Sequence, residues 1–501
     1  MSGLTNKKYI CRTGSVEPAV ADARMENMQT AVTLQRRADT LLSEGKPEAA
    51  ISLLTTALIK DPGRSSMIHK LGQCLDKTGS EKDAVSCFRG SLPDSINEQY
   101  FNSSSLTKVV KPASLCNGVE YLPAFEPEEI ELEPPVRNKT DKRYPQFNYR
   151  KTEARETFCT VAANGSIWFD GFNTVAFDCE DNIIEQQTKG NEFTCYHAMK
   201  ESDACELDGT ACFLDGRSSR IYYHWILDIL PKLGVLEKSG LAVADIDYFI
   251  VSASSTFQLA TLRACGVRED QLVFSRATSL YCADKMIIPC LRNDLGERVY
   301  HGLGVGLASW IPDFLKTRLS RGQDDNQPPS DASDCAEPVK VYISRSARGS
   351  RNIANEPAMI EALQSRGFIT VEFENLTVVQ QAELMSRATI VVGVHGAGFT
   401  NLSFCKPGTR VIEIFGDYVV PCYWALCAVA GLAYAQFMAK SVDSSSTAAN
   451  PGQMVAQLRD REIEIDVDAF IDYVDAVLSD STHGDSNSLP GSASSGNAVS
   501  A

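Results

Sequence analysis

The chain of 501 residues is 44% hydrophobic and 22% charged, which is ordinary for a globular protein and long enough for two or three domains. Its formal net charge of −16 argues against a nucleic-acid-binding role, because phosphate neutralisation needs a basic face. The sixteen cysteines form no Cys-x-x-Cys pattern and no His-x-x-x-His accompanies them, so we expect reduced thiols and no metal site.

The first thirteen residues contain three basic side chains, but the apolar run of a secretory signal does not follow them. We therefore expect a cytoplasmic protein, either free or at the membrane surface, without a transmembrane segment. Residues 1–30 are expected to form a flexible N-terminus.

A repeat with a period of 34 residues follows within residues 31–100, which we expect to form a tetratricopeptide-like helical segment. Small residues such as Ala38 and Ala50 would let two antiparallel helices approach closely. The first copy comprises Leu34, Ala38, Leu41, Ala50, Leu54, Ala57 and Pro62, and the second comprises Ile68, Gly72, Leu75, Ala84, Phe88, Ser91 and Ile96, of which the last two depart from the pattern. Two copies are fewer than a free-standing solenoid needs, so they either support the rest of the chain or bind a protein partner.

Three polar stretches divide the remaining chain. Residues 101–145 contain an acidic run, residues 321–337 are mostly polar, and residues 481–501 are rich in Ser, Gly and Ala. We expect two linkers and a disordered tail. They separate an N-terminal lobe over residues 146–320 from a C-terminal lobe over residues 338–480.

The C-terminal lobe alternates strands with helices. Strands are predicted over 339–344, 368–373, 389–394 and 410–415, and helices over 356–365, over 377–387, from about 397, and within the apolar run 418–439. Asn355 would cap the first helix, and Thr377 with Gln380 forms a capping box for the second. The apolar run is long enough to span a membrane, but Pro421 near its start and its high Ala content favour a buried helix.

Strand–helix alternation of this kind predicts a parallel, doubly wound sheet of the Rossmann type. The N-terminal lobe is less regular, with strands predicted over 248–252 and 285–289. We therefore expect an α/β protein whose two lobes hold a ligand in the cleft between them.

The segment 392–401 carries the strongest chemical signal. A buried strand runs into His395, Gly396, Ala397 and Gly398, and a helix follows. Glycines let a ligand approach the backbone, and a helix N-terminus offers N–H groups and a partial positive charge. Because the turn lies at the carboxyl end of a strand, we expect it to bind a phosphate or diphosphate, although glycines can also simply turn the chain.

Asn401 stands where a dinucleotide-binding motif would have a third glycine, so that motif is excluded, and we expect Asn401 to belong to the substrate site instead. Arg345 follows a predicted strand and shares a sheet edge with His395, where its guanidinium could grip a diphosphate. Glu413 lies among β-branched residues in another strand. A buried carboxylate needs a partner, which ribose hydroxyls or a structural ion pair would provide.

In the N-terminal lobe, a predicted helix begins near Tyr222 and places His224 and Asp228 on one face. The pair could act as a general base and the group that orients it, and we favour Asp228 as the base; a pair that only caps the helix or is solvated is the alternative. Asp245 and Asp247 form an Asp-x-Asp sequence, but it precedes its predicted strand, so we do not expect it to hold a metal.

Four motifs occur in order along the chain. They are Tyr-Tyr-His-Trp-Ile-Leu-Asp-x-Leu-Pro-Lys-Leu at 222–233, Tyr-Ile-Ser-Arg at 342–345, Gly-x-His-Gly-Ala-Gly-x-Thr-Asn-Leu at 393–402 and Pro-Gly-Thr-Arg-Val-Ile-Glu-Ile at 407–414. Through these motifs the chain resembles glycosyltransferase family 61 over about residues 150–475. The family usually has Asn before the Tyr-His-Trp segment, where this chain has Ser219, Arg220 and Ile221.

The resemblance implies a GT-B-like pair of Rossmann-type lobes with a facing cleft, an inverting mechanism, and no metal or other cofactor. It also implies transfer of a sugar such as xylose, arabinose or N-acetylglucosamine from a nucleoside-diphosphate sugar to a glycan or glycoprotein hydroxyl. Arg345 and the N–H groups after Gly396 would stabilise the leaving diphosphate. The alternatives are a non-catalytic scaffold that senses a nucleotide sugar and uses its repeats for protein binding, and a metal-dependent transferase.

Overall fold

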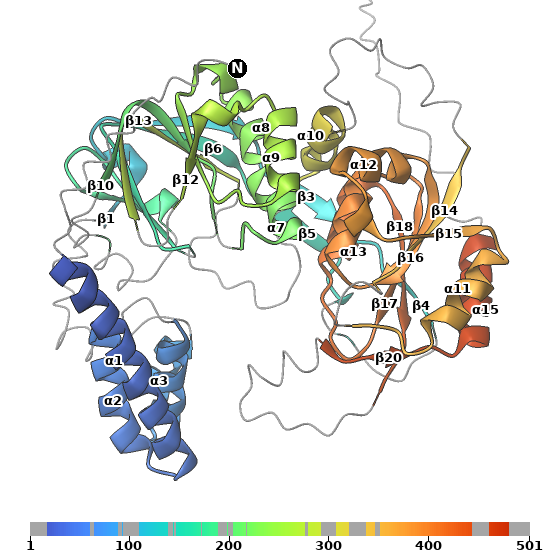
Figure 1. The fold of residues 1–501 in the computed structure, drawn as a ribbon, viewed down its shortest axis with the longest axis horizontal. Helices are drawn as coiled ribbons and strands as arrows, with labels where there is room; N and C mark the ends of the chain where they lie inside the picture. The colour runs from blue at the N-terminus through green and yellow to red at the C-terminus, as the bar shows by residue number, and fades with distance from the viewer. Residues whose placement is uncertain are drawn as a thin grey trace, which may run out of the picture. The chain divides into compact units, whose positions relative to one another are not determined.

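A computed structural model gives the architecture of the chain (Figure 1). It describes residues 18–60, 65–88, 93, 110–138, 144, 147–171, 173–188, 198, 204–216, 218–275, 279–291, 307–319, 337–345, 351–442 and 460–479. The chain divides into two compact units, unit 1 from Met1–Ile130 with Lys151–Asp324 and unit 2 from Glu131–Arg150 with Asp325–Ala501. The predicted tail 481–501 and all but the last residue of the predicted linker 321–337 lie outside the described residues.

Four helices form the N-terminal segment, drawn in blue in Figure 1: α1 (Pro18–Ser43), α2 (Pro47–Lys60), α3 (Ser65–Lys77) and α4 (Glu81–Phe88). Consecutive helices contact each other, and predicted small residues such as Ala38, Ala50 and Ala84 are buried between them. The predicted helical hairpins are therefore confirmed. Pro62, Ser91, Ile96 and the side chain of Phe88 lie outside the described residues.

The first helix starts earlier than the sequence suggested. It begins at Pro18, so residues 18–30 are helical. Proline suits the first helical position, because that residue needs no N–H partner. Ala, Met, Glu and Gln dominate the following residues and favour helix.

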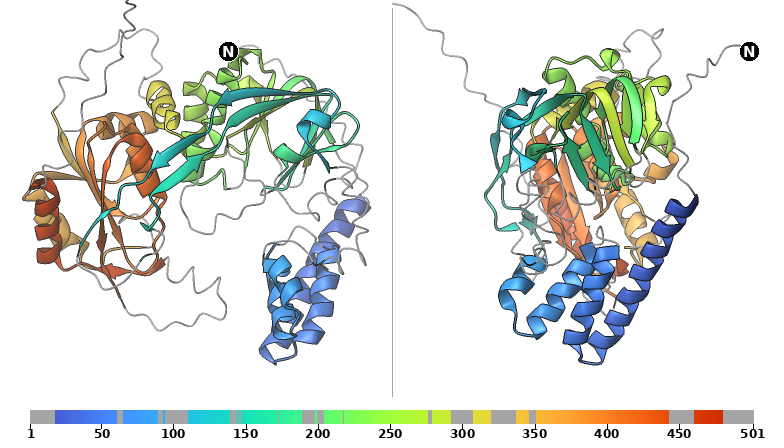
Figure 2. Two further views of the ribbon diagram at one scale, coloured as in Figure 1. Left: turned by 180° about the vertical axis from the view of Figure 1, so that it is seen from behind. Right: turned by 90° about the vertical axis from the view of Figure 1, so that its left-hand side faces the viewer.

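Unit 1 contains a mixed ten-stranded sheet, in contrast to the purely parallel sheet expected of a Rossmann-type lobe. The path runs β1-β9-β8-β7-β13-β10-β11-β12, with β6 also paired to β13 and β2 to β6. Its strands are β1 (Val110–Lys111), β2 (Val119–Phe125), β6 (Thr157–Ala163), β7 (Ser166–Phe169), β8 (Thr174–Phe177), β9 (Ile183–Ile184), β10 (Ala204–Phe213), β11 (Tyr248–Val251), β12 (Leu272–Phe274) and β13 (Ser279–Cys290). Strands β10 to β13 are parallel, whereas β6 and β7 run antiparallel to β13 (Figure 2, left).

The helices of unit 1 follow its parallel strands. They are α7 (Tyr222–His224), the π-helical turn η5 (Trp225–Ile229), α8 (Lys232–Lys238), α9 (Thr256–Ala264) and α10 (Trp310–Leu319), with short 3-10 turns at Ala113–Leu115, Glu185–Gln187, Val243–Asp245 and Glu269–Gln271. Helix α8 packs on β2, β6 and β13. The connection from β10 through η5 and α8 to β11 is therefore a crossover that covers the sheet, as parallel strands require.

The segment expected to be a linker over 101–145 is largely structured where it is described. It contains β1 and β2 of the large sheet, β3 (Glu128–Glu131), which pairs with β5 (Lys151–Ala154), and β4 (Val136–Arg137), which joins the sheet of unit 2. Val119, Tyr121 and Phe125 alternate with other residues, a strand signal that the surrounding polar composition hid.

Unit 2 is a six-stranded sheet in which every pair of strands is parallel, with the order β15-β14-β16-β17-β18-β4. The strands are β14 (Val339–Ile343), β15 (Phe368–Val371), β16 (Ala388–Val394), β17 (Arg410–Phe415) and β18 (Ala433–Met438), besides β4. The helices are α11 (Glu356–Gln364), α12 (Val378–Ser386), the 3-10 helix η10 (Ala397–Phe404), α13 (Cys422–Ala430) and α15 (Val467–Ser479), with a 3-10 turn at Phe373–Asn375 and a ribbon of β19 (Lys440–Ser441) and β20 (Ile463–Glu464). Helices α11 and α15 lie on one face and α12 and α13 on the other, so the predicted doubly wound sheet is confirmed (Figure 1).

Two details of unit 2 differ from the prediction. The apolar run 418–439 is helix α13 followed by strand β18, because Gly431 adopts a left-handed φ of +67° and ends the helix. Asn355 precedes α11 as predicted, but its side chain binds the backbone of Ile465 instead of capping the helix. Among the described residues, no helix is long and apolar enough to cross a membrane.

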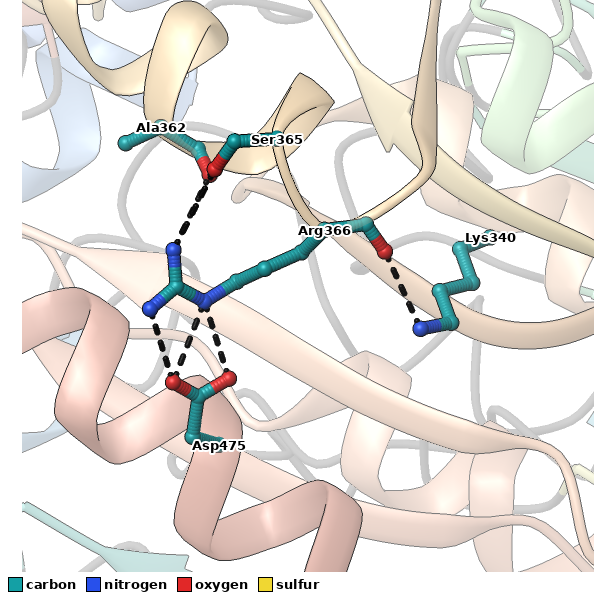
Figure 3. A network of polar contacts seen from close by, with 5 residues as sticks. All are labelled: Lys340, Ala362, Ser365, Arg366 and Asp475. Carbon is teal, nitrogen blue, oxygen red and sulfur yellow. Dashed lines mark hydrogen bonds and ion pairs between the residues drawn. The ribbon is translucent and has the colours of Figure 1, made fainter.

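A polar network fixes the last helix of unit 2 (Figure 3). The guanidinium of Arg366, just after α11, donates to both carboxylate oxygens of Asp475 on α15 over 2.8 to 3.0 Å. Lys340 of β14 donates to the carbonyl of Arg366 over 3.0 Å. Hydrogen bonds from Arg366 hold the pKa of the Asp475 carboxyl below its ordinary value.

Candidate active site

The helix that carries His224 and Asp228 contains a π-helical turn. The N–H of Leu230 donates to the carbonyl of Trp225, five residues earlier, over 2.9 Å. The indole of Trp225 is fully buried and donates to Oγ1 of Thr261 over 2.9 Å, which anchors the apolar side of the turn. Such turns are rare and concentrate at functional sites.

His224 and Asp228 contact each other on the accessible side of this turn. Nδ1 of His224 lies 2.7 Å from Oδ2 of Asp228, and the two side chains are 36% and 20% exposed. The predicted shared helix face is therefore confirmed. Because a carboxylate only accepts hydrogen bonds, the contact places a proton on Nδ1 and leaves Nε2 as the ring nitrogen that can accept another.

The carboxyl ends of β10, β11 and β12 meet in a buried polar cluster that the sequence did not reveal. The hydroxyls of Ser252 and Ser275 each donate to Oδ2 of Asp215 over 2.5 Å. Lys232, the first residue of α8, donates to the carbonyl of Asp215 over 2.5 Å. The contact between Asp215 and Lys232 joins the two ends of the segment that contains the π-helical turn. A polar residue shortly after each apolar strand was the signal that could have identified this cluster.

In unit 2, two predicted site residues meet where the winding of the sheet reverses, between β14 and β16. Arg345 follows β14, and Gly396 follows β16. An added Cβ on Gly396 would overlap Nη1 of Arg345 and lie 2.9 Å from its Cζ, so the guanidinium lies directly against the glycine. The predicted shared edge is confirmed, and doubly wound sheets bind ligands at this point.

His395, which precedes Gly396, is held by a buried carboxylate. Its Nδ1 lies 2.5 Å from Oε1 of Glu413, and the hydroxyl of Tyr434 donates to Oε2 over 2.5 Å. Burial and the adjacent Glu413 raise the pKa of Tyr434 well above its ordinary value. Glu413 is 0% exposed. Both its oxygens are thus bonded to protein side chains, as in the structural alternative, and the ribose contact stays a prediction.

His395 also lines a small pocket at the carboxyl ends of β16 and β17. Nη1 of Arg351 donates to the carbonyl of His395 over 2.9 Å, and Arg461 pairs with Asp417 over 3.1 Å. Arg351 has a φ of +58°, a strained conformation for a non-glycine residue that is often found at functional sites. The side chains that line the pocket include Arg351, His395, Asp417, Tyr418, Ser441 and Arg461.

The remaining predicted residues lie in η10, which is a 3-10 helix. Ala397 and Gly398 are half-buried at its start, so the beginning of the helix lies at the edge of the sheet beside Arg345. Asn401 is fully buried, and its amide donates to Oε1 of Gln381 on α12 over 2.7 Å. Asn401 therefore holds η10 against α12, and its place in the substrate site stays a prediction.

The Asp-x-Asp sequence has a structural role. Asp247 immediately precedes β11, which begins at Tyr248. Its Oδ2 accepts a hydrogen bond from the N–H of Thr210 over 2.9 Å. Within the described ranges, no group of three or more His, Cys, Asp and Glu side chains is placed to hold a metal ion. The free cysteines of the described residues include the buried Cys74, Cys87 and Cys265.

The family comparison covers both groups of site residues. Residues 222–412 match the model of the family Glycosyltransferase 61. They form a glycosyltransferase 61 domain. The protein is therefore a glycosyltransferase, an enzyme that uses a sugar donor and an acceptor. No curated protein matches the chain.

The glycosyltransferase 61 domain begins at the first residue of α7 and ends within β17. It includes His224, Asp228, Arg345 and His395, but Glu413 and Tyr434 lie beyond it. Helices α1–α4 also lie outside the match, so their identity as tetratricopeptide repeats stays a prediction.

Proposed function

We propose that the glycosyltransferase 61 domain moves a sugar, such as xylose, arabinose or N-acetylglucosamine, from a UDP-sugar to a hydroxyl of a glycan or a protein-linked glycan. The transfer inverts the anomeric configuration and needs no metal. The placement of Arg345 against Gly396, at the carboxyl edge of a doubly wound sheet, carries this proposal. A guanidinium and a glycine-lined helix start are what a diphosphate requires.

The charges around this edge favour a diphosphate. Arg345 lies against Gly396, and Arg351 and Arg461 line the pocket beside His395. Asp417 offsets one of these positive charges through its pair with Arg461. The excess positive charge would stabilise the diphosphate as negative charge builds up on it during the reaction.

The acceptor hydroxyl needs a base, for which we propose the pair of His224 and Asp228. The acceptor oxygen attacks the anomeric carbon, the bond from that carbon to the diphosphate oxygen breaks, and the electron pair leaves with UDP. The sequence favoured Asp228 as the base. The observed contact favours His224, whose Nε2 takes the hydroxyl proton while Asp228 orients the ring through Nδ1.

Thermal shift with UDP and a panel of UDP-sugars, in buffer with EDTA, tests the donor site. We expect UDP to raise the melting temperature of the wild type, because a ligand that binds only the folded state stabilises it. Arg345→Ala should reduce the shift, whereas Arg387→Ala is the matched control, since Arg387 precedes β16 at the opposite edge of the sheet. A shift that needs Mn²⁺ would contradict metal independence, and no shift with any nucleotide would contradict the donor class.

Turnover of the base variants tests the acceptor side. We expect His224→Gln and Asp228→Asn to lower UDP release in the presence of an acceptor by roughly 10²- to 10⁴-fold, with UDP binding unchanged. Near-normal turnover of either variant would contradict the assignment.

A further inference from the structure

Glu413 is a buried carboxylate with two hydrogen-bonding partners, His395 and Tyr434. It lies in β17, is 0% exposed, and contacts Nδ1 of His395 and the hydroxyl of Tyr434, each over 2.5 Å. A carboxylate in such a place needs compensation by charge or by hydrogen bonds. Because burial raises the pKa of Tyr434, that hydroxyl stays protonated and satisfies only one oxygen. The other oxygen requires a proton on Nδ1 of His395.

The packing around His395 fixes its orientation. The ring stacks on Phe415, with 5.3 Å between centroids and 25° between planes. The ring centroids of Tyr418 and Tyr423 lie 6.1 and 5.4 Å from that of His395. With Nδ1 turned to the buried Glu413, Nε2 lies on the opposite side of the ring. His395 lines the pocket at the carboxyl edge, so Nε2 is the polar atom it can offer there.

We propose that Glu413 is a positioning residue that keeps a proton on Nδ1 of His395 while Tyr434 binds its second oxygen, so that the ring meets the diphosphate of the donor as an imidazolium that donates from Nε2. This inference rests on the proposed donor site. A ring that already carries a proton on Nδ1 can donate from Nε2 only in its doubly protonated form. Glu413 balances the resulting charge, as carboxylates do for orienting histidines elsewhere.

The other charged and titratable groups around the ring come from several elements. They are Arg351, which binds the carbonyl of His395; Tyr423 on α13; Tyr418; the Arg461–Asp417 pair; and Arg345 at the neighbouring Gly396. Among these groups only Asp417 is anionic at neutral pH, and Arg461 pairs with it. Glu413 is thus the group that favours a positive charge on the ring.

Nitrogen-15 NMR of the histidine side chains in the full chain tests the proposal directly. The chain has six histidines, and His395→Gln identifies the resonances of His395. In the complex of the wild type with UDP at pH 7.5, we expect both ring nitrogens of His395 to be protonated. In Glu413→Gln the amide can donate to Nδ1, so the ring should become the neutral form with its proton on Nε2, and UDP affinity should fall roughly 10- to 100-fold.

Glu356→Gln is the matched control. Glu356 is also a buried carboxylate of unit 2 and accepts from Tyr342 over 2.6 Å and from Ser344 over 2.9 Å, but it has no histidine partner among the described contacts. It should leave the His395 spectrum and UDP affinity unchanged. Tyr434→Phe removes the second donor but keeps the carboxylate, so Nδ1 should stay protonated even if the variant is less stable.

Two results would overturn the proposal: a wild-type His395 that lacks a proton on either ring nitrogen in the UDP complex, or a Glu413→Gln variant with the wild-type spectrum and affinity. Failure of UDP to bind the wild type would instead overturn the proposed donor site. In that event the spectrum without UDP still tests whether Glu413 keeps a proton on Nδ1.

Discussion

Gly396→Ala is the sharpest test of the donor site, because its effect should act through a single neighbour. Gly396 has φ 176° and ψ 167°, an extended conformation that alanine adopts without strain. The new methyl group would overlap Nη1 of Arg345. The guanidinium must therefore leave its place, and the side chain would lose the position from which it grips a diphosphate.

The expected loss follows from the contact that is displaced. A hydrogen bond to a charged group contributes about 1.5–3 kcal/mol, which corresponds to roughly a 10- to 150-fold weaker affinity for UDP. We expect isothermal titration with UDP to show this loss for Gly396→Ala and a similar one for Arg345→Ala. The urea midpoint should change little, because the methyl group meets a mobile side-chain end and not the backbone.

A double-mutant cycle separates this mechanism from simple crowding of the turn. With Arg345 already replaced by Ala, Gly396→Ala should weaken UDP binding by less than about 0.5 kcal/mol. Gly398→Ala is the control, because its methyl group would meet only the side chains of Phe373 and Ile343, at 3.2 and 3.4 Å, so it should not couple to Arg345. Wild-type affinity in Gly396→Ala, or an equal loss with and without Arg345, would refute the reasoning.

Three further predictions concern stability. Asp215→Ala removes the acceptor of three partly buried donors and should lower the free energy of unfolding by about 2–4 kcal/mol, measured by urea denaturation. The exposed Asp270→Ala should change it by less than about 0.5 kcal/mol. Burial raises the pKa of Cys265 from 9.0 to about 12, so the thiol ionises less readily in the folded state and the free energy of unfolding should fall as pH rises above 9. Cys265→Ala should make that fall shallower. The same slope in both proteins would contradict the raised pKa of Cys265. Arg366 lowers the pKa of Asp475, so Asp475→Asn should reduce the urea midpoint near neutral pH, and the difference should disappear as pH falls below the ordinary value of 3.8; a difference that is independent of pH would show that the charge plays no part.

Sequence reasoning succeeded where neighbours in space are dictated by local rules. Parallel strands share a carboxyl edge, so residues that follow β14 and β16, such as Arg345 and Gly396, had to meet. The pair His224 and Asp228 followed from helical spacing in the same way.

Sequence reasoning failed where contacts depend on distant segments or on which partner a buried group finds. Nothing near Glu413 in sequence announced that Tyr434, on the next strand, would bind its second oxygen. The motif around Asn401 also did not indicate that its amide would bind Gln381 on the neighbouring helix. Likewise, two residues of β4 pair with β18 only because the tertiary fold brings them together, and short strands carry little local signal.

The pairing of β4 with β18 has a consequence for biosynthesis. Asn138, just after β4, binds the backbone of Met438, which lies 300 residues later in the chain. At ribosomal rates of about 5–20 residues per second, this partner emerges some 15–60 s after the first strand. Leu132 and Phe147 are almost fully buried in the folded chain, but during that interval the sheet of unit 2 is still incomplete. Folding of this part of unit 2 is therefore completed only when synthesis is nearly finished.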